Sequence, residues 1–149
     1  HVEILNQRIC DRLQHYLPAS KVNSIRVCFR KILINAIEHG NLGIKFEEKT
    51  AAMASGDYMA FLRSRMRDAE FKNRRVYVDF IVDEAKIAFR VTDEGAGFDL
   101  EEHLNRLDNP DAVQALEHGR GIAMTRHVFD KVAYNRKGNQ VVLVKTIRP

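Results

Sequence analysis

The stretch that decides the fold is Lys31-Ile-Leu-Ile-Asn-Ala-Ile-Glu-His-Gly-Asn41. Its apolar residues recur at the spacing of a helix with one buried face, and they are Ile32, Leu33, Ala36 and Ile37. The pattern predicts the last turns of a helix. Gly40 is expected to form a left-handed cap at its C-terminal end, as glycine commonly does there.

Three polar residues share the other side of this predicted helix. At about 100° per residue, Lys31, Asn35 and Glu38 fall on one narrow stripe. An uncharged amide between two charges is either a solvated surface residue or a group that binds a ligand. The helix alone leaves both interpretations open.

Length and composition indicate one soluble domain spanning residues 1–149. Hydrophobic residues make up 45% of the chain, charged residues 30%, and no apolar run reaches the roughly 18 residues of a membrane span. The chain begins at His1, inside a helical pattern, so we expect a piece excised from a longer protein. Cys10 and Cys28 lack metal-like spacing and are predicted to be core residues in a reducing cytoplasm.

The charge balance is only mildly basic, with a net charge of +4 and a pI near 9.2. The densest basic run, within residues 63–75, is interrupted by acids and is predicted to be a solvated face and not a nucleic-acid surface. The overall sign suits a polyanionic ligand elsewhere. We therefore expect neither nucleic acid nor a membrane as a partner.

The first half of the chain is predicted to be helical. One helix spans residues 2–17, and a second, N-capped by Ser20, spans about 21–39. A further helical pattern runs over 45–73, with Gly56 separating two pieces. We interpret about 46–73 as a helical insertion.

The second half is predicted to be mostly strands. Residues 76–82 and 87–92 alternate in polarity on either side of the turn Asp83-Glu84, which predicts an antiparallel hairpin. A polar stretch over 99–118 has the length of a functional lid or a disordered segment. A short helix over 122–130 and two strands, about 131–136 and 140–147, close the chain.

Two glycine-rich stretches carry the chemistry. Asp93 closes a strand directly before Gly95 and Gly97, so a carboxylate there can accept a hydrogen bond from an exocyclic amine while the glycines admit a flat ring. Gly119-Arg-Gly-Ile122 opens a helix whose N-terminal amides can bind a phosphate. Taken singly, the first could be a simple β-turn and the second a simple loop-to-helix junction.

Together, the Asn35 helix, Asp93-Glu-Gly-Ala-Gly97 and Gly119-Arg-Gly121 resemble the GHKL ATPase superfamily, which has the Bergerat nucleotide-binding fold. The resemblance covers roughly residues 20–147. The residues within the three motifs are similar to those of the branch that holds the anti-sigma-factor serine kinases. It implies an α+β fold, a two-layer α/β sandwich in which helices cover one face of a mixed, mostly antiparallel sheet.

The resemblance also implies roles in binding ATP and Mg²⁺. Asn35 would ligate Mg²⁺, Asp93 would bind the adenine amino group, and Gly95 and Gly97 would support the ring pocket. His39 would lie near the nucleotide. Gly119, Arg120, Gly121 and Ile122 would face the phosphates, and residues 99–118 would form the ATP lid.

Lys31 departs from the family pattern, because that position is normally the glutamate that acts as general base. A lysine with an ordinary pKa near 10.4 is a cation at pH 7 and cannot take a proton. Losing a positioned base typically costs 10²–10⁴ in rate. Glu38 is an alternative base, although we expect it to be a surface acid near the helix end.

Three functions are therefore compatible with the sequence. The chain is a serine/threonine protein kinase of the anti-sigma type with impaired phosphotransfer, a non-catalytic ATP-dependent partner-switching module, or the ATPase domain of a histidine kinase. The first two imply a sigma factor or a STAS-like anti-anti-sigma protein as partner. A homodimer is left open.

Overall fold

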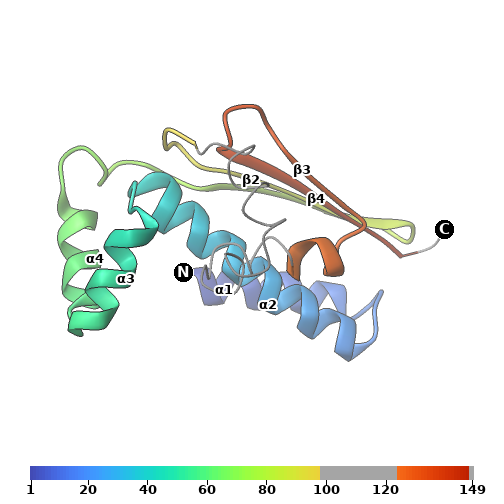
Figure 1. Ribbon diagram of the computed structural model, residues 1–149. Coiled ribbons are helices and arrows are strands. Elements are labelled where there is room, and N and C mark those ends of the chain that lie inside the picture. The colour runs from blue at the N-terminus through green and yellow to red at the C-terminus, as the bar shows by residue number, and fades with distance from the viewer. Residues whose placement is uncertain (98–123, 148–149) are drawn as a thin grey trace.

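The computed structural model describes residues 1–97 and 124–147. Its four strands form one sheet in the order β1-β2-β4-β3, and they are β1 (Tyr77–Val82), β2 (Lys86–Thr92), β3 (Lys131–Tyr134) and β4 (Gln140–Thr146). Figure 1 shows α1 (Val2–Leu13) and α2 (Ala19–Asn35) covering one face of this sheet. The predicted α+β class with helices on one face is confirmed, and every pairing between the described strands is antiparallel.

The alternation of polar and apolar residues in the sequence predicts β1 and β2 correctly. They form the predicted antiparallel hairpin, with Phe80 opposite Phe89 and Val82 opposite Ile87. Strand β2 then pairs with β4, which puts Phe89 opposite Leu143. This pairing fixes which residues of β2 face the helices, because side chains alternate between the faces of a sheet.

The core lies between the sheet and the two helices, and aromatic rings fill its centre. Phe89 contacts Phe29 of α2 with ring centroids 4.7 Å apart, Phe80 at 5.0 Å and Phe129 at 5.8 Å. Cys10 and Cys28 are both free and fully buried, as predicted. None of the described helices is long and apolar enough to cross a membrane.

The junction between the first two helices differs from the prediction. Helix α1 ends at Leu13 and not at residue 17, and α2 begins at Ala19. The backbone oxygen of Pro18 accepts hydrogen bonds from the amides of Lys21 and Val22, at 3.0 and 3.1 Å. Pro18 therefore occupies the N-cap position, and the prediction of Ser20 as N-cap is wrong.

Helix α2 does not stop at a glycine cap but widens into a turn of π-helix, η1 (Ala36–Asn41). The amide of Leu42 donates to the oxygen of Ile37 at 2.9 Å, a spacing of five residues. Gly40 lies inside this turn, so its prediction as the left-handed cap is wrong, and Gly43, with φ +57°, has the left-handed conformation instead. Single π-turns within helices occur frequently at functional sites.

The predicted helical stretch after residue 45 consists of α3 (Phe46–Ser55) and α4 (Tyr58–Arg67). Gly56, with φ +80°, separates them as predicted. Figure 1 shows the pair beside η1, beyond the end of the sheet. Lys49 of α3 donates to Glu38 at 2.8 Å, and Arg65 of α4 donates to the Leu42 oxygen at 3.3 Å. That the pair is an insertion stays a prediction.

Candidate functional site

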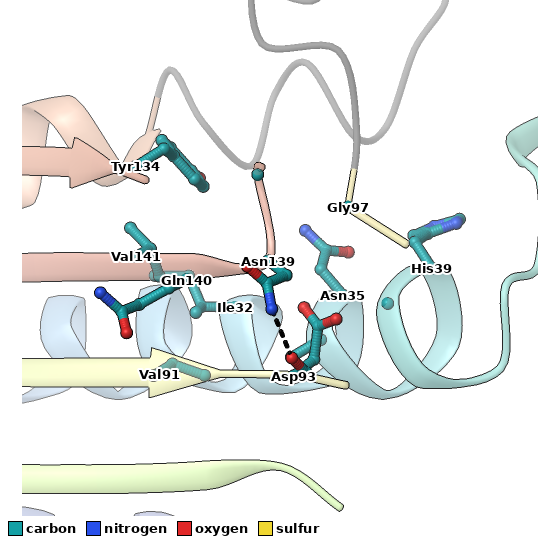
Figure 2. A pocket seen from close by; sticks show the side chains of 13 residues that line it. Ile32, Asn35, His39, Val91, Asp93, Gly97, Tyr134, Asn139, Gln140 and Val141 are labelled. Atoms are coloured by element: carbon teal, nitrogen blue, oxygen red, sulfur yellow. Dashed lines mark hydrogen bonds between the residues drawn. The ribbon is translucent and has the colours of Figure 1, made fainter. Parts of the chain in front are cut away.

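A narrow cavity of about 80 Å³ lies where β2 ends, between α2 with η1 and the turn that joins β3 to β4. Figure 2 shows Asp93 at its floor and Asn35 beside it. Much of its wall is apolar and is formed by Ile32, Ala36, Val91, Tyr134 and Val141. A slot with apolar walls and one carboxylate suits a flat ring that carries a hydrogen-bond donor.

The strand pairing holds Asp93 rigidly. Its amide donates to the Asn139 oxygen at 2.9 Å, and the side-chain amide of Asn139 donates back to the Asp93 oxygen at 2.9 Å, as Figure 2 shows for the second bond. The Oδ1 atom of Asp93 accepts from the Gly95 amide at 2.8 Å. The carboxylate is thus fixed before any ligand arrives, which lowers the entropic cost of binding.

Close backbone approach explains two glycines at this site. A Cβ added to Gly40 would lie 2.4 Å from Cγ of Asp93, and one added to Gly95 would lie 2.2 Å from the Gly40 oxygen. Both distances are far below van der Waals contact. Gly95 therefore allows its segment to pack against the backbone of η1, and Gly40 leaves room for the Asp93 carboxylate. Together they bring Asp93 next to the helix that carries Asn35.

Burial sets the electrostatics of the cavity. It raises the pKa of Asp93, while the Gly95 amide, Lys137 and Arg74 act in the opposite direction and favour the carboxylate. Burial also raises the pKa of Tyr134 to about 12, so this wall residue stays neutral at pH 7. The buried carboxylate costs stability, and a cost of this kind at a rigid cavity is common at binding sites.

We expect Asp93→Asn to raise the thermal midpoint of unfolding at pH 7 relative to wild type. Because the folded pKa of Asp93 is raised, its contribution to stability is fully present below the ordinary Asp pKa of about 3.9 and is lost as pH rises through the folded value. The advantage of the asparagine variant should therefore be small at pH 3.5 and grow toward neutral pH. Melting curves of both proteins across this range check it, and an advantage that shrinks with pH would contradict it.

Asn35 and His39 connect this cavity to a second, wider groove. Both residues line the narrow cavity and also the groove, whose volume is about 500 Å³. Nδ1 of His39 lies 2.6 Å from the Ile44 oxygen, and Figure 2 shows the ring directed away from Asp93. His39 is therefore beside the cavity, and its predicted contact with a nucleotide stays a prediction.

The oxygen atoms at this site fit a Mg²⁺ ion that is bound partly by the protein and partly by the phosphates of a substrate. Within residues 1–97 and 124–147, no group of three or more His, Cys, Asp or Glu side chains could hold a metal ion. Mg²⁺ usually keeps several waters and is shared between one or two protein oxygens and substrate phosphates. One amide oxygen from Asn35, which lies where cavity and groove meet, fits that mode of binding.

Lys31 and Glu38 both line the wider groove. Glu38 is only 8% exposed and is bound by Lys49, so the expectation of a surface acid is wrong. The helix pattern could not reveal this, because Lys49 comes from α3, eleven residues later in the chain.

Several predicted site residues lie outside the described residues. These are Gly119, Arg120, Gly121 and Ile122, together with the lid over 99–118 and the first part of the short helix predicted over 122–130. The described part of that helix is helical over 124–128.

The turn between β3 and β4 and the strand residues on either side of it supply site residues that the sequence interpretation missed. Tyr134, Gly138, Asn139 and Gln140 all line the narrow cavity. The pairing of Thr92 with Gln140 brings this turn beside Asp93, although 46 residues separate Asp93 from Asn139. Asn139, which lies between the strands predicted at about 131–136 and 140–147, was the available signal, but only the strand order gives it a role.

The α+β domain has two layers, a helix that carries Asn35, and a buried Asp93 at a strand end with closely packed glycines beside it. These features together are typical of GHKL-type ATPase domains. The chain matches the family model of the histidine kinase-like ATPase domain over residues 6–145, and it belongs to that family. It is thus an ATP-binding module of the GHKL type. Comparison with curated proteins gave no match.

Proposed function

We propose that this chain is an ATP-binding switch domain of the anti-sigma-factor serine/threonine kinase type, in which nucleotide binding is retained and phosphotransfer is impaired. The geometry of Asp93 is the observation that supports nucleotide binding. Its backbone is bound by Asn139, and its carboxylate is buried, accepts a hydrogen bond from the Gly95 amide and lies at the floor of a slot with apolar walls.

The slot favours adenine over guanine. The exocyclic amine of adenine donates to the Asp93 carboxylate, whereas guanine has a carbonyl oxygen at that position, which would repel it. Sites built to hydrogen-bond one group reject analogues that lack it more strongly than apolar pockets reject a change in size. The ring would lie between Ile32 and Ala36 of the helix side and Val91 and Val141 of the sheet.

Mg²⁺, when bound, neutralises the phosphates and aligns them, and Asn35 would hold it. Asn35 has the position for this role because it lies between the base slot and the wider groove.

Two observations support impaired phosphotransfer. Lys31, one turn before Asn35, lines the groove where a kinase of this type would need a base, and a lysine ammonium cannot accept a proton. Glu38 also lines the groove, but its carboxylate is engaged by Lys49 at 2.8 Å. Neither residue supplies an unengaged carboxylate beside Asn35.

The absence of a general base favours partner switching over phosphotransfer as the function of this domain. In that mode a sigma factor or a STAS-like anti-anti-sigma protein would bind according to the nucleotide present, without needing rapid turnover. The ATPase domain of a histidine kinase is the second candidate, because the matched family is described as histidine kinase-like.

Asp93→Asn is expected to lower the affinity for ATP by about 10-fold to 100-fold, because a hydrogen bond to a charged group contributes roughly 1.5–3 kcal/mol. Calorimetric titration of wild type and variant with Mg·ATP and Mg·GTP measures this, and wild type should prefer ATP. Asp79→Asn is the matched control, since Asp79 is an exposed residue of β1 that pairs with Arg90. Absence of any heat of binding with wild-type protein would overturn the proposed function.

A further inference from the structure

The C-terminal end of η1 is held by two arginines that come later in the chain. Arg65 of α4 donates through Nη1 to the backbone oxygen of Leu42 at 3.3 Å, and Arg74 donates through Nη1 to the backbone oxygen of Asn41 at 2.9 Å. Both guanidinium groups lie over the ring of Phe71, 5.4 and 5.0 Å from its centroid. Cations that bind the last carbonyls of a helix stabilise its end. The two arginines and the ring therefore fix the last residues of η1.

Asn41 connects this end of η1 to the segment that contains Asp93. Its side-chain Oδ1 accepts a hydrogen bond from the backbone amide of Glu94 at 2.7 Å. Asn41 is only 5% exposed, so water competes weakly for this bond. Glu94 directly follows Asp93, and the next amide, that of Gly95, donates to the Asp93 carboxylate at 2.8 Å. A continuous series of contacts therefore leads from Arg74 through Asn41 to the floor of the narrow cavity.

The Asp93 segment is thus held from two sides. Asn139, next to β4, binds the backbone of Asp93, and Asn41 of η1 binds the following amide. Neither Asn41 nor Arg74 is among the described residues that line the narrow cavity or the wider groove, so neither would touch a ligand there. Their influence on binding is therefore indirect.

We propose that Arg74 and Asn41 are positioning residues for nucleotide binding: Arg74 fixes the last residues of η1, and Asn41 fixes the backbone beside Asp93 to them. A carboxylate that is fixed before the ligand arrives binds it at a lower entropic cost. Because Arg65 belongs to α4, the same contacts connect the α3–α4 pair to the site. The inference rests on the proposed binding of ATP and deepens it, since it names residues that set the affinity without contacting the nucleotide.

Arg74→Met removes the donor and keeps most of the length of the side chain. It is expected to lower the affinity for Mg·ATP about 10-fold in calorimetric titration, because ordering one released residue on binding costs about that much. In the ligand-free protein, hydrogen exchange of the Glu94 and Gly95 amides should become faster. The Phe89 amide in β2 should stay protected, which shows that the variant is folded. Arg74→Lys keeps a charged donor and should return both measurements toward wild type.

Arg75→Met is the matched control, since it removes the same charge from the exposed neighbouring residue. Arg75 binds Glu94 through its backbone amide, which this substitution leaves in place, so both measurements should match wild type. Asn41→Ala removes the acceptor of the Glu94 amide, and adding Arg74→Met to it should therefore cause little further loss of affinity. A purely electrostatic effect of Arg74 would persist in that background, so additive losses would overturn the inference.

The two measurements also separate this inference from the proposed function. If wild type binds Mg·ATP and Arg74→Met binds it equally tightly, the inference is wrong and the proposed function stands. The same holds if the affinity falls while the Glu94 and Gly95 amides exchange as in wild type, because Arg74 would then not act through the backbone beside Asp93. If wild type binds no ATP, the proposed function fails, and the inference that rests on it fails as well.

Discussion

Replacing Gly40 by alanine is expected to lower the affinity for ATP by about 100-fold, although alanine is the better helix former by roughly 1 kcal/mol. The new Cβ would lie 2.4 Å from Cγ of Asp93 and 2.6 Å from its Oδ2. The carboxylate must move, and in doing so it would break its bond to the Gly95 amide and leave the position that adenine needs. The lost charged hydrogen bond and the obstructed slot together account for an effect of this size.

Calorimetric titration with Mg·ATP measures the loss, and Gly56→Ala is the matched control. Gly56 has φ +80° and no atom within 4 Å of an added Cβ, so its substitution strains the backbone far from the cavity. It should cost stability and leave ATP affinity unchanged.

A double-mutant cycle sharpens the interpretation of Gly40→Ala. In an Asp93→Ala background the carboxylate is absent, so adding Gly40→Ala should cause little further loss. Strong non-additivity is the signature of two residues in direct contact. A Gly40→Ala protein that binds ATP as tightly as wild type would show that the contact between η1 and Asp93 does not control the site.

The fold could be predicted where one periodicity dominates. The alternation on either side of Asp83-Glu84 gave the hairpin, and the helical spacing of Ile32 and Leu33 gave the buried face of α2, because both patterns report local burial. The ends of the elements could not be predicted as well. Helix α2 begins at Ala19, so that Pro18 is its N-cap and Ser20 lies inside it. The π-turn at Gly40 packs closely against Asp93, which is distant in sequence.

The site was predictable to the extent that its residues carry local signals. Asp93 is followed by two glycines, and Asn35 interrupts an apolar helix, so both could be singled out from the sequence. Asn139 and the pairing of Glu38 with Lys49 could not be found in this way. They arise from the strand order and from the position of α3, and neither is encoded in the neighbouring residues.

Lys31→Glu is expected to raise the rate of ATP cleavage by about 10²–10⁴-fold, because it would restore a positioned general base at the groove beside Asn35. With the partner protein unidentified, water is the acceptor to use, and ADP release under single-turnover conditions measures the step. ATP must be saturating, so that a change in ATP affinity does not alter the measured rate.

Lys31→Gln is the control that separates the gain of a base from the loss of the lysine charge. Like Lys31→Glu it removes the cation, but it supplies no base, so its rate of cleavage at saturating ATP should stay near that of wild type. A rate increase shared by both variants would mean that the lysine charge inhibits cleavage and that the missing base is not the cause. A wild-type rate that already equals that of Lys31→Glu would mean that another group takes the proton. Glu38, released from Lys49, is the residue to test next, and Glu38→Gln should then abolish the activity.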